Sequence, residues 1–525
     1  MSQSHRLSRR AFLGALGGAT VGLALPVGGR RWDLLGLGGA PEALAAVPFR
    51  ARLPIPPVLR DDHIRIPIEA ADAAIMPGPE TRLWTFGGSF PGPTIRRPAG
   101  RRTLVTYEHR LPHDAGELSV HFHGGHSRSA MDGQPGGLTG DQPVSFYCDV
   151  PYDLSPRQSG NDLLIRPGGE KTYVYDLRED GGPVRGSFRW YHDHRLDRTA
   201  LHSWRGLAGM WIIDDELEDS LPLPRGARDL PLMIADRSFG RRNQLTDPFT
   251  NLRPPNDGTA GARILVNGAF MPHHEVEACR YRLRLLNVSA FRSYALELSN
   301  GAPLVQIATD SGLMPRPVRR RQILLGPAER AEVVVDFSPF AGEAVELRSS
   351  ARHPGRNPLG AHTYSGALMQ FRVGAPGFDD TRIPRRLRPL PEWTKHVRRR
   401  PDHTWTITVG GLFKTTWLIN GKTFDPARVD TKPRLGSTVT WAIHNRTAVA
   451  HVIHLHHTDW YLLSREGRPP PPWEDCLKET FFVFPGERIL VAGRLTDYAG
   501  KFVIHCHMFD HEDHGLMSQF EVVRD

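Results

Sequence analysis

Apolar and polar residues alternate with a period of two in several segments of the chain. Residues 281–285 (Tyr-Arg-Leu-Arg-Leu) and residues 404–409 (Thr-Trp-Thr-Ile-Thr-Val) both follow this pattern. Successive side chains of a strand point to opposite faces, so the alternation predicts half-buried β-strands. Helical periodicity is scarce, and turns rich in proline and glycine separate the strands. The pattern therefore predicts an all-β fold made of sandwiches or Greek-key barrels.

Two stretches break the strand pattern and are interpreted as linkers. Residues 216–229 contain Leu-Pro-Leu-Pro, and prolines and arginines interrupt residues 374–391. A length of 525 residues also suggests about three domains. A short internal repeat, Leu-Val-Asn-Gly at 265–268 and Leu-Ile-Asn-Gly at 418–421, supports this division. The expected domains are residues 46–215, 216–385 and 386–525.

Residues 1–45 have the features of an export signal. Arg9 and Arg10 precede an apolar stretch, and residues 43–45 (Ala-Leu-Ala) fit a cleavage site between small residues. The paired arginines favour the twin-arginine route, which carries folded proteins. An anchoring helix is the alternative, but the apolar stretch holds four glycines and ends at Pro26, which is short for a membrane span. We expect a periplasmic or extracellular protein with no stable membrane insertion after cleavage.

Composition narrows the class of protein further. The chain is 39% hydrophobic and 23% charged, with 52 glycines and 45 prolines, which is typical of a soluble globular protein rich in turns. The net charge is +9, and residues 1–45 hold five arginines and two acids, so the rest of the chain carries about +6. Arginine runs at 319–321 and 398–400 are interpreted as solvated surface. We expect a monomer with no nucleic-acid partner.

The four cysteines divide into two kinds. Cys148, Cys279 and Cys476 could form a disulfide in an exported protein, but their spacings match no disulfide framework or zinc site, so their pairing stays open. Cys506 lies directly between two histidines and needs a different explanation.

Ten of the 25 histidines fall into four short clusters. The clusters are His121 with His123, His192 with His194, His451 with His454 and His456, and His505 with His507 and His511. On a strand, residues two apart present both imidazoles to one side. A single such pair would be interpreted as an ordinary surface or core pair. Zinc would explain histidine pairs, but a thiolate grouped with imidazoles in this number indicates copper.

In order and spacing these clusters resemble the four copper-binding motifs of three-domain multicopper oxidases, particularly the branch of bilirubin oxidase, spore-coat laccase and phenoxazinone synthase. Supporting matches lie at residues 90–95, 308–313, 326–330 and 473–475. The resemblance covers nearly the whole mature chain. It implies three cupredoxin-like Greek-key β-barrels and four copper ions. The implied reaction couples one-electron oxidation of a reducing substrate to four-electron reduction of dioxygen to water.

The resemblance also implies a role for each clustered residue. The type 1 copper would be bound by His451, Cys506 and His511, and the type 2 copper by His121 and His454. The two type 3 coppers would be bound by His123, His192, His194, His456, His505 and His507. The trinuclear cluster would then lie between domains 1 and 3. Because Cys506 is covalently joined to two type 3 ligands, it would also give electrons a short route between the centres.

Two acids match residues that supply protons in this branch of the family. They are Asp132, nine residues after His123, and Glu512, directly after His511. Either could instead be a structural carboxylate, and the resemblance favours the proton role. Other residues beside the motifs match no ligand position, and we interpret them as structural neighbours: Asp193, His126, His457 and His514.

The chain departs from many relatives ten residues after the type 1 cysteine. A methionine often lies there as a weak axial ligand, whereas here the position is Leu516 and Met517 follows. Laccases of other branches also carry leucine, so the site stays functional in principle. A leucine cannot coordinate copper, so we expect a comparatively high type 1 potential.

The reductant itself is not readable from the motifs. Phenols, aromatic amines, tetrapyrroles and reduced metal ions are the candidates. The chain has ten methionines but no methionine-rich segment, which favours a laccase-like enzyme over a dedicated cuprous oxidase. An alternative is a copper-free exported scaffold of the same fold, which the complete ligand set disfavours. A two-domain copper nitrite reductase is disfavoured by the length and by the paired type 3 histidines.

Overall fold

The structure is a computed structural model that describes residues 47–136, 163–249, 258–350, 364–410 and 416–524. The predicted export signal and Cys148 lie outside these ranges. Within them, no helix combines the length and the apolar character that crossing a bilayer requires.

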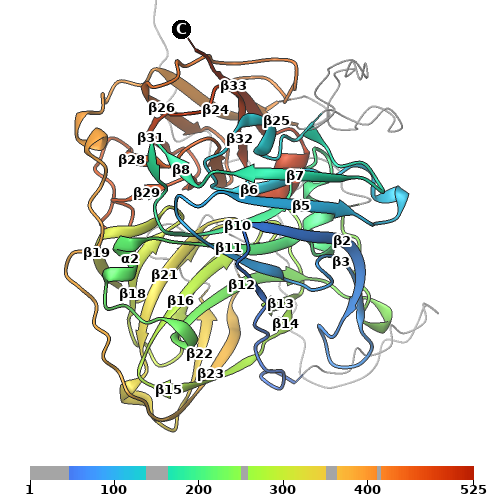
Figure 1. Cartoon of the computed structure of the whole chain (residues 1–525), viewed down its shortest axis with the longest axis vertical. Coiled ribbons are helices and arrows are strands. Elements are labelled where there is room, and N and C mark those ends of the chain that lie inside the picture. The colour runs from blue at the N-terminus through green and yellow to red at the C-terminus, as the bar shows by residue number, and fades with distance from the viewer. Residues whose placement is uncertain (1–46, 137–162, 250–257, 351–363, 411–415, 525) are drawn as a thin grey trace, which may run out of the picture. The chain divides into compact units, whose positions relative to one another are not determined.

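The described chain consists mainly of β-strands arranged in seven sheets (Figure 1). The predicted all-β fold is confirmed. Six sheets form three consecutive pairs along the chain, and each pair encloses a core of buried apolar side chains. The seventh sheet is a two-stranded ribbon.

The first pair consists of a five-stranded sheet, β1-β4-β11-β10-β6, and a four-stranded sheet, β3-β2-β5-β7. Its strands, with those of the ribbon β8-β9, are β1 (Val58–Leu59), β2 (His63–Ala73), β3 (Thr81–Phe86), β4 (Gly92–Pro98), β5 (Thr103–His109), β6 (Val120–His123), β7 (Glu170–Tyr175), β8 (Arg178–Glu179), β9 (Gly182–Pro183), β10 (Ser187–Asp193) and β11 (Ala208–Asp214).

The second pair consists of a seven-stranded sheet, β14-β13-β12-β16-β21-β18-β19, and a five-stranded sheet, β15-β23-β22-β17-β20. Its strands are β12 (Asp229–Arg237), β13 (Arg263–Val266), β14 (Ala269–Phe270), β15 (His273–Ala278), β16 (Arg280–Asn287), β17 (Tyr294–Leu298), β18 (Leu304–Thr309), β19 (Gly312–Arg320), β20 (Ile323–Leu325), β21 (Arg330–Asp336), β22 (Ala344–Ser349) and β23 (Gly366–Pro376).

The third pair consists of a six-stranded sheet, β25-β24-β26-β31-β28-β29, and a four-stranded sheet, β30-β27-β32-β33. Its strands are β24 (His403–Gly410), β25 (Thr416–Ile419), β26 (Thr438–Asn445), β27 (His451–Leu455), β28 (Trp460–Arg465), β29 (Leu477–Lys478), β30 (Thr480–Val483), β31 (Arg488–Arg494), β32 (Gly500–Cys506) and β33 (Met517–Val522).

The helices of the described chain are short. The α-helices are α1 (Thr199–Arg205), α2 (Glu216–Ser220) and α3 (Phe509–Asp513). The 3-10 turns are η1 (His113–Ala115), η2 (Ser129–Met131), η4 (Gly226–Arg228), η5 (Arg241–Asn243), η6 (Ser338–Phe340) and η8 (Glu392–His396). The segment interpreted as the first linker, residues 216–229, holds α2 and η4. Asp215 caps α2 by accepting a hydrogen bond from the backbone of Glu218, which favours a helix at this point.

The two alternating segments behave differently. β24 buries every second residue over most of its length, so its prediction as a half-buried strand is confirmed. In β16 both faces are buried, and the prediction of a half-buried strand is wrong there. The polar positions Arg282 and Arg284 are at most 2% exposed because they form ion pairs with the buried Glu332, Glu218 and Asp229. The free-energy cost of burying a charged group is much lower when an oppositely charged group is buried beside it.

The internal repeat is a repeated turn. Asn267 and Gly268 follow β13, and Asn420 and Gly421 follow β25, and all four have φ between 48° and 80°. Asn-Gly is the favoured pair for a hairpin turn that needs positive φ at both central residues. In both turns the asparagine side chain accepts a backbone hydrogen bond of 2.8 Å from a neighbouring strand.

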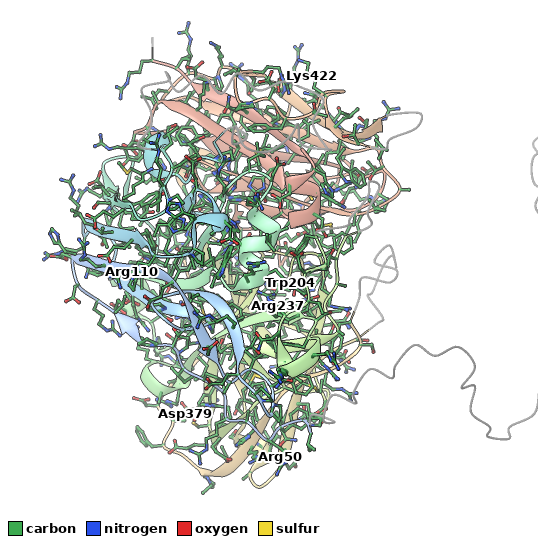
Figure 2. The ribbon with its side chains drawn as sticks, turned by 90° about the vertical axis from the view of Figure 1, so that its right-hand side faces the viewer. Arg50, Arg110, Trp204, Arg237, Asp379 and Lys422 are labelled. Carbon is green, nitrogen blue, oxygen red and sulfur yellow. The ribbon has the colours of Figure 1, made fainter. Side chains whose placement is uncertain are left out.

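Helix α1 links β12 to the C-terminal helix α3. Figure 2 shows Trp204 of α1 next to Arg237 of β12, whose guanidinium lies 5.2 Å from the centre of the indole ring. At the other end of α1, the backbone N–H of Ala200 donates to Asp513 of α3 at 2.9 Å. These contacts hold α3 in place, and α3 carries His511, one of the predicted copper ligands.

Candidate metal centres

The predicted ligands are all at most 3% exposed. His121 and His123 lie on β6, His192 on β10, His451 and His454 on β27, His505 and Cys506 on β32, and His511 in α3, while His194, His456 and His507 directly follow β10, β27 and β32. Strand ends therefore carry most of the candidate site.

Strand pairing brings the clusters together two at a time. β10 runs antiparallel to β6 and places His192 opposite His121. β27 runs antiparallel to β32 and places His454 opposite His505. Contacts between the strand pair β6–β10 and the strand pair β27–β32 then join residues from the first and the last parts of the chain. Nε2 of His454 lies 3.4 Å from Nε2 of His121.

Eight of the histidines converge in one place and form three groups of three. In each group the donor atoms lie within 4.8 Å of one another. The groups are His123, His192 and His507; His194, His456 and His505; and His121, His454 and His456. Within the second group, Nε2 of His505 lies 3.2 Å from Nε2 of both His194 and His456.

Several ring nitrogens of these histidines lack a hydrogen-bond partner in the described part of the chain and are therefore available to bind a metal. Nε2 of His123, Nε2 of His192 and both ring nitrogens of His507 find no hydrogen-bond partner among the described residues. Buried polar atoms without partners are costly, and here several point into one small volume. Groups of three imidazoles with open lone pairs match the sites that imidazole ligands form with copper.

Burial keeps these imidazoles in the form that binds metals. Burial lowers the pKa of His192 to about 3, with a further lowering by the neighbouring His194. Burial likewise holds the pKa of His123 and His507 well below its usual range. A metal ligand must be unprotonated, so the rings are ready to bind without losing a proton at neutral pH.

A second, separate group consists of His451, Cys506 and His511. Sγ of Cys506 lies 3.6 Å from Nδ1 of each histidine, and the two Nδ1 atoms are 3.1 Å apart. Burial raises the pKa of the Cys506 thiol to about 12, so its thiolate form needs a cation beside it. Two imidazoles and one thiolate in a trigonal arrangement are the ligand set of a blue copper site.

Leu516 and Met517 are both fully buried but face different surroundings. Leu516 packs in the same apolar cluster as Cys506, and its backbone oxygen accepts a hydrogen bond from Cys506 N at 3.0 Å. Met517 packs in another cluster, with Phe424 and Val503. Leu516, which directly precedes β33, therefore lies on the side of Cys506.

Two aromatic rings lie against the histidines of the second group. The indole of Trp417 is 5.0 Å from the ring of His451 and 4.4 Å from the ring of His511. The ring of Phe291 is 5.5 Å from the ring of His511. Trp417 is 6% exposed and Phe291 2%, so the histidine edges are covered by aromatic surface.

Asp132 contacts the eight-histidine site directly. Its Oδ2 lies 2.7 Å from Nδ1 of His456, and its backbone oxygen faces Nδ1 of His121. The Ser127 hydroxyl donates to Oδ1 at 3.2 Å. Burial raises the pKa of Asp132 well above its usual value, so this carboxyl can hold a proton.

Glu512 contacts the site from the opposite end of the chain. Its Oε2 lies 3.0 Å from Nδ1 of His505, and its Oε1 lies 3.7 Å from Nε2 of His194. Burial acts to raise the pKa of Glu512, but its electrostatic interactions with the rings of His505 and His194 and its hydrogen bond with His505 outweigh burial and lower the pKa to about 2. The surroundings of the two acids therefore shift their pKa values in opposite directions.

Sequence reasoning missed Glu479 and gave Arg330 no role. The carboxylate of Glu479 lies 3.2 Å from Nδ1 of His123, and its backbone oxygen faces Nδ1 of His454 at 3.0 Å. Burial raises the pKa of Glu479 to about 7, although the nearby Arg330 and Arg189 favour the ionised carboxylate and act to lower its pKa. Glu479 stands in no recognisable motif, and only the resemblance around residues 326–330 could have drawn attention to Arg330.

The residues interpreted as neighbours make contacts of their own. Asp193 accepts from the backbone of Ser119 at 2.8 Å and faces Nδ1 of His202 at 2.7 Å. The ring of His126 lies between the backbone oxygen of His457 and a carboxylate of Asp497. Of the cysteines in the described part of the chain, Cys279, Cys476 and Cys506 are free thiols.

Comparison with known proteins agrees with this geometry. Two family models, both described as multicopper oxidase, match residues 68–145 and 392–525. A laccase from Bacillus stratosphericus is 32% identical over 496 residues, which cover 85% of this chain and 92% of the laccase. The cell division protein FtsP from Pectobacterium atrosepticum is 30% identical over 468 residues, which cover 86% of this chain and 88% of FtsP.

The fold leads to the same family. The crystal structure of a laccase from Pediococcus acidilactici Pa5930 superposes with a TM-score of 0.76 at 28% identity, covering 91% of this chain and 95% of the laccase. Its fold is that of three cupredoxin-like domains, as predicted. Identity of 30% or more over most of both chains shows that this chain belongs to the multicopper oxidase family, as a laccase-like copper oxidoreductase that passes electrons from a reducing substrate to dioxygen.

Proposed function

We propose that the chain binds four copper ions in two centres and oxidises aromatic organic reductants. The single type 1 ion would be held by His451, Cys506 and His511. The type 2 ion would be held by His121 and His454, and the type 3 pair by His123, His192 and His507 on one side and His194, His456 and His505 on the other. The observation that carries this assignment is the convergence of three-histidine groups, together with nitrogens of His123, His192 and His507 that have no hydrogen-bond partner among the described residues.

The chain joins the two centres through one tripeptide. Bound copper supplies a centre that accepts and passes on single electrons, so that four can reach one dioxygen molecule. Cys506 binds the first centre through Sγ, while His505 and His507 belong to the second. Their shared backbone gives a covalent path between the substrate side and the oxygen side.

Asp132 and Glu512 would provide the protons that water formation needs. Each carboxyl lies within 3.0 Å of a ring nitrogen of a proposed type 3 ligand, His456 and His505 respectively. Asp132 also has the Ser127 hydroxyl as a proton-carrying partner. Acids at this distance can pass protons to a reacting oxygen directly or through one water.

Aromatic reductants fit the surroundings of the proposed type 1 site. The indole of Trp417 lies against both type 1 histidines, and Phe291 lies against His511. Phe291 is 2% exposed and Trp417 6%, so a planar phenol or aromatic amine would meet these rings at the exposed edge of Trp417, which contacts both type 1 histidines. The ten methionines form no methionine-rich segment, which argues against a dedicated cuprous oxidase.

The remaining assignments follow from the sequence and extend the proposal. We infer domains at residues 46–215, 216–385 and 386–525, with the trinuclear site between the first and the third. We also infer export by the twin-arginine route, guided by Arg9 and Arg10, and a monomeric mature protein.

A substrate screen on copper-loaded protein tests the proposal. Copper per chain and the visible spectrum would be measured first, and oxygen uptake would then be recorded with a phenol, an aromatic amine, a tetrapyrrole and cuprous ion. We expect four copper ions, an intense blue colour and the highest kcat/KM with an aromatic reductant. Fastest turnover of cuprous ion would contradict the substrate class. A colourless protein without copper or oxygen uptake would favour the scaffold role instead.

A further inference from the structure

Glu479 touches two proposed copper ligands at once. Oε1 of its side chain lies 3.2 Å from Nδ1 of His123, and its backbone oxygen lies 3.0 Å from Nδ1 of His454. Its side chain is fully buried, in the short connection between β29 and β30. His123 lies on β6 and His454 on β27, so one residue contacts ligands from both ends of the chain.

These contacts hold one side of each imidazole. The backbone oxygen accepts a hydrogen bond from Nδ1 of His454, and the carboxylate places negative charge 3.2 Å from Nδ1 of His123. Nε2 of His123 has no partner among the described residues, and the ring groups with His192 and His507. Glu479 therefore holds the His123 ring on its Nδ1 side and leaves Nε2 free for a metal.

A buried carboxylate needs cations of its own, and Arg330 supplies the nearest one. Nη2 of Arg330 forms an ion pair with Oε1 of Glu479, and Nη1 of Arg189 lies 4.0 Å from Oε2. Arg330 is fully buried, and its guanidinium also donates to the backbone oxygens of Phe188 at 3.1 Å and Ala328 at 2.8 Å. Its position is therefore fixed independently of Glu479.

Arg330 comes from a part of the chain that holds none of the proposed ligands. It is the first residue of β21, in the seven-stranded sheet of the second pair. Its Nη1 lies 3.4 Å from Nδ1 of His123. The middle part of the chain thus reaches the eight-histidine site through Arg330, and the Ser311 hydroxyl of the same part donates to Oε2 of Glu479 at 3.4 Å.

We propose that Glu479, held by Arg330, is a positioning residue for the type 3 copper bound by His123. It orients the His123 ring and lets the middle part of the chain determine copper affinity at a centre to which it gives no ligand. This inference rests on the proposed assignment of His123 as a type 3 ligand. Removing such a partner of a ligating histidine typically costs 10–100-fold in metal affinity.

The proposal predicts a loss confined to one kind of copper. The contact with His454 is made by the backbone of Glu479, so it survives a change of side chain. The contact with His123 is made by the carboxylate and does not survive. Copper held by His123 should therefore weaken, while copper held by His454 and by Cys506 should not.

The test compares Glu479→Leu, whose side chain has no acceptor for His123, with a matched control, Glu332→Leu. Glu332 is equally buried, but it pairs with Arg282 and Arg284 rather than with a proposed ligand. Copper affinity would be measured by competition with a chelator, and the centres would be followed by the blue absorption, the electron paramagnetic resonance signal of type 2 copper and the type 3 absorption.

In Glu479→Leu we expect binding of type 3 copper to weaken about 10–100-fold while the blue absorption and the type 2 signal persist. In Glu332→Leu we expect all three to stay as in the wild type. Type 3 copper bound as tightly in Glu479→Leu as in the wild type would overturn the proposal, and so would an equal loss in Glu332→Leu. A wild-type protein that binds no copper at all would instead overturn the proposed function.

Glu479→Leu leaves Arg330 buried without its partner, which could prevent folding. The double variant Glu479→Leu with Arg330→Leu removes both charges together, so neither is left buried without the other. We expect it to show the same selective loss of type 3 copper, because no carboxylate faces His123. Wild-type affinity for type 3 copper in the double variant would overturn the proposal.

Discussion

Oδ2 of Asp132 lies 2.7 Å from Nδ1 of His456, although the two residues are 324 positions apart in the chain. The contact joins a carboxyl from the N-terminal part of the chain to a proposed type 3 ligand from the C-terminal part. It sets the carboxyl where it can both orient the imidazole and hand a proton to a reacting oxygen.

Asp132→Asn should slow oxygen reduction while changing copper content little. An amide keeps a hydrogen-bonding side chain beside His456 but cannot deliver a proton. Proton transfer by a placed side chain contributes about 10²–10⁴-fold, so we expect reoxidation of the reduced enzyme by dioxygen to slow by at least roughly 10²-fold. Stopped-flow single-turnover reoxidation measures this rate. Asp236→Asn is the control, since Asp236 is equally buried but pairs with Arg292. An unchanged rate in Asp132→Asn would rule out the proton role.

Leu516→Met should lower the potential of the type 1 copper. A thioether donates electron density and stabilises the oxidised ion, whereas leucine cannot coordinate. Met517 packs on the other side of β33, with Phe424 and Val503, so Met517→Leu should leave the potential unchanged. Redox titration of the blue absorption decides the matter. The account fails if Met517→Leu raises the potential markedly while Leu516→Met has no effect.

The ring of His126 should stabilise the fold in a way that depends on pH. Nδ1 faces the backbone oxygen of His457 at 2.7 Å and Nε2 faces Asp497 at 3.0 Å, and neither oxygen can donate, so the ring is doubly protonated. Burial acts to lower the pKa of His126, but the hydrogen bond to Asp497 and the charge of Glu179 outweigh it and raise the pKa. A raised pKa gives stability that is complete below the unfolded value of about 6.5 and is lost as the pH rises through the folded value.

Asp497→Asn tests this pH dependence. Hydrogen bonds to charged groups contribute about 1.5–3 kcal/mol, so the variant should melt several degrees below the wild type at about pH 6. At about pH 9 the difference should shrink, because the wild-type ring has then lost its proton. Thermal unfolding followed by circular dichroism measures both. His113→Gln, at an exposed histidine, should change neither melting temperature. A difference between wild type and Asp497→Asn that is independent of pH would refute the charged ring.

The sequence was most informative where chemistry depends on spacing. Histidines two apart on a strand share a face, so the clusters at His121 and His454 could be recognised from the order of residues alone. Alternation also predicted β24. It failed for β16, because the period of two cannot distinguish an arginine in solvent from one such as Arg284, which is buried by a distant partner, Asp229. Ion pairs between residues far apart in the chain leave no local pattern.

Glu479 escaped prediction for the same reason. Nothing near it in the sequence marks it as a neighbour of copper ligands, since its partners His123 and Arg330 lie far away in the chain. The different surroundings of Leu516 and Met517, by contrast, could be inferred, because adjacent side chains of an extended segment point to opposite sides. Local geometry was therefore predictable, and the partners of buried charges were not.

Cys506→Ser tests the central claim most directly, because it deletes the thiolate of one proposed centre and leaves all eight histidines of the other. Cys476→Ser is the matched control, since burial also raises the pKa of this thiol to about 12 but its partner is the Thr309 hydroxyl at 3.4 Å. Copper per chain, visible absorption and oxygen uptake with a phenolic reductant would be measured together. We predict that Cys506→Ser loses the blue colour and the turnover but keeps most of the remaining copper, while Cys476→Ser behaves as the wild type. Oxygen uptake by Cys506→Ser at the wild-type rate would contradict the entry of electrons through Cys506.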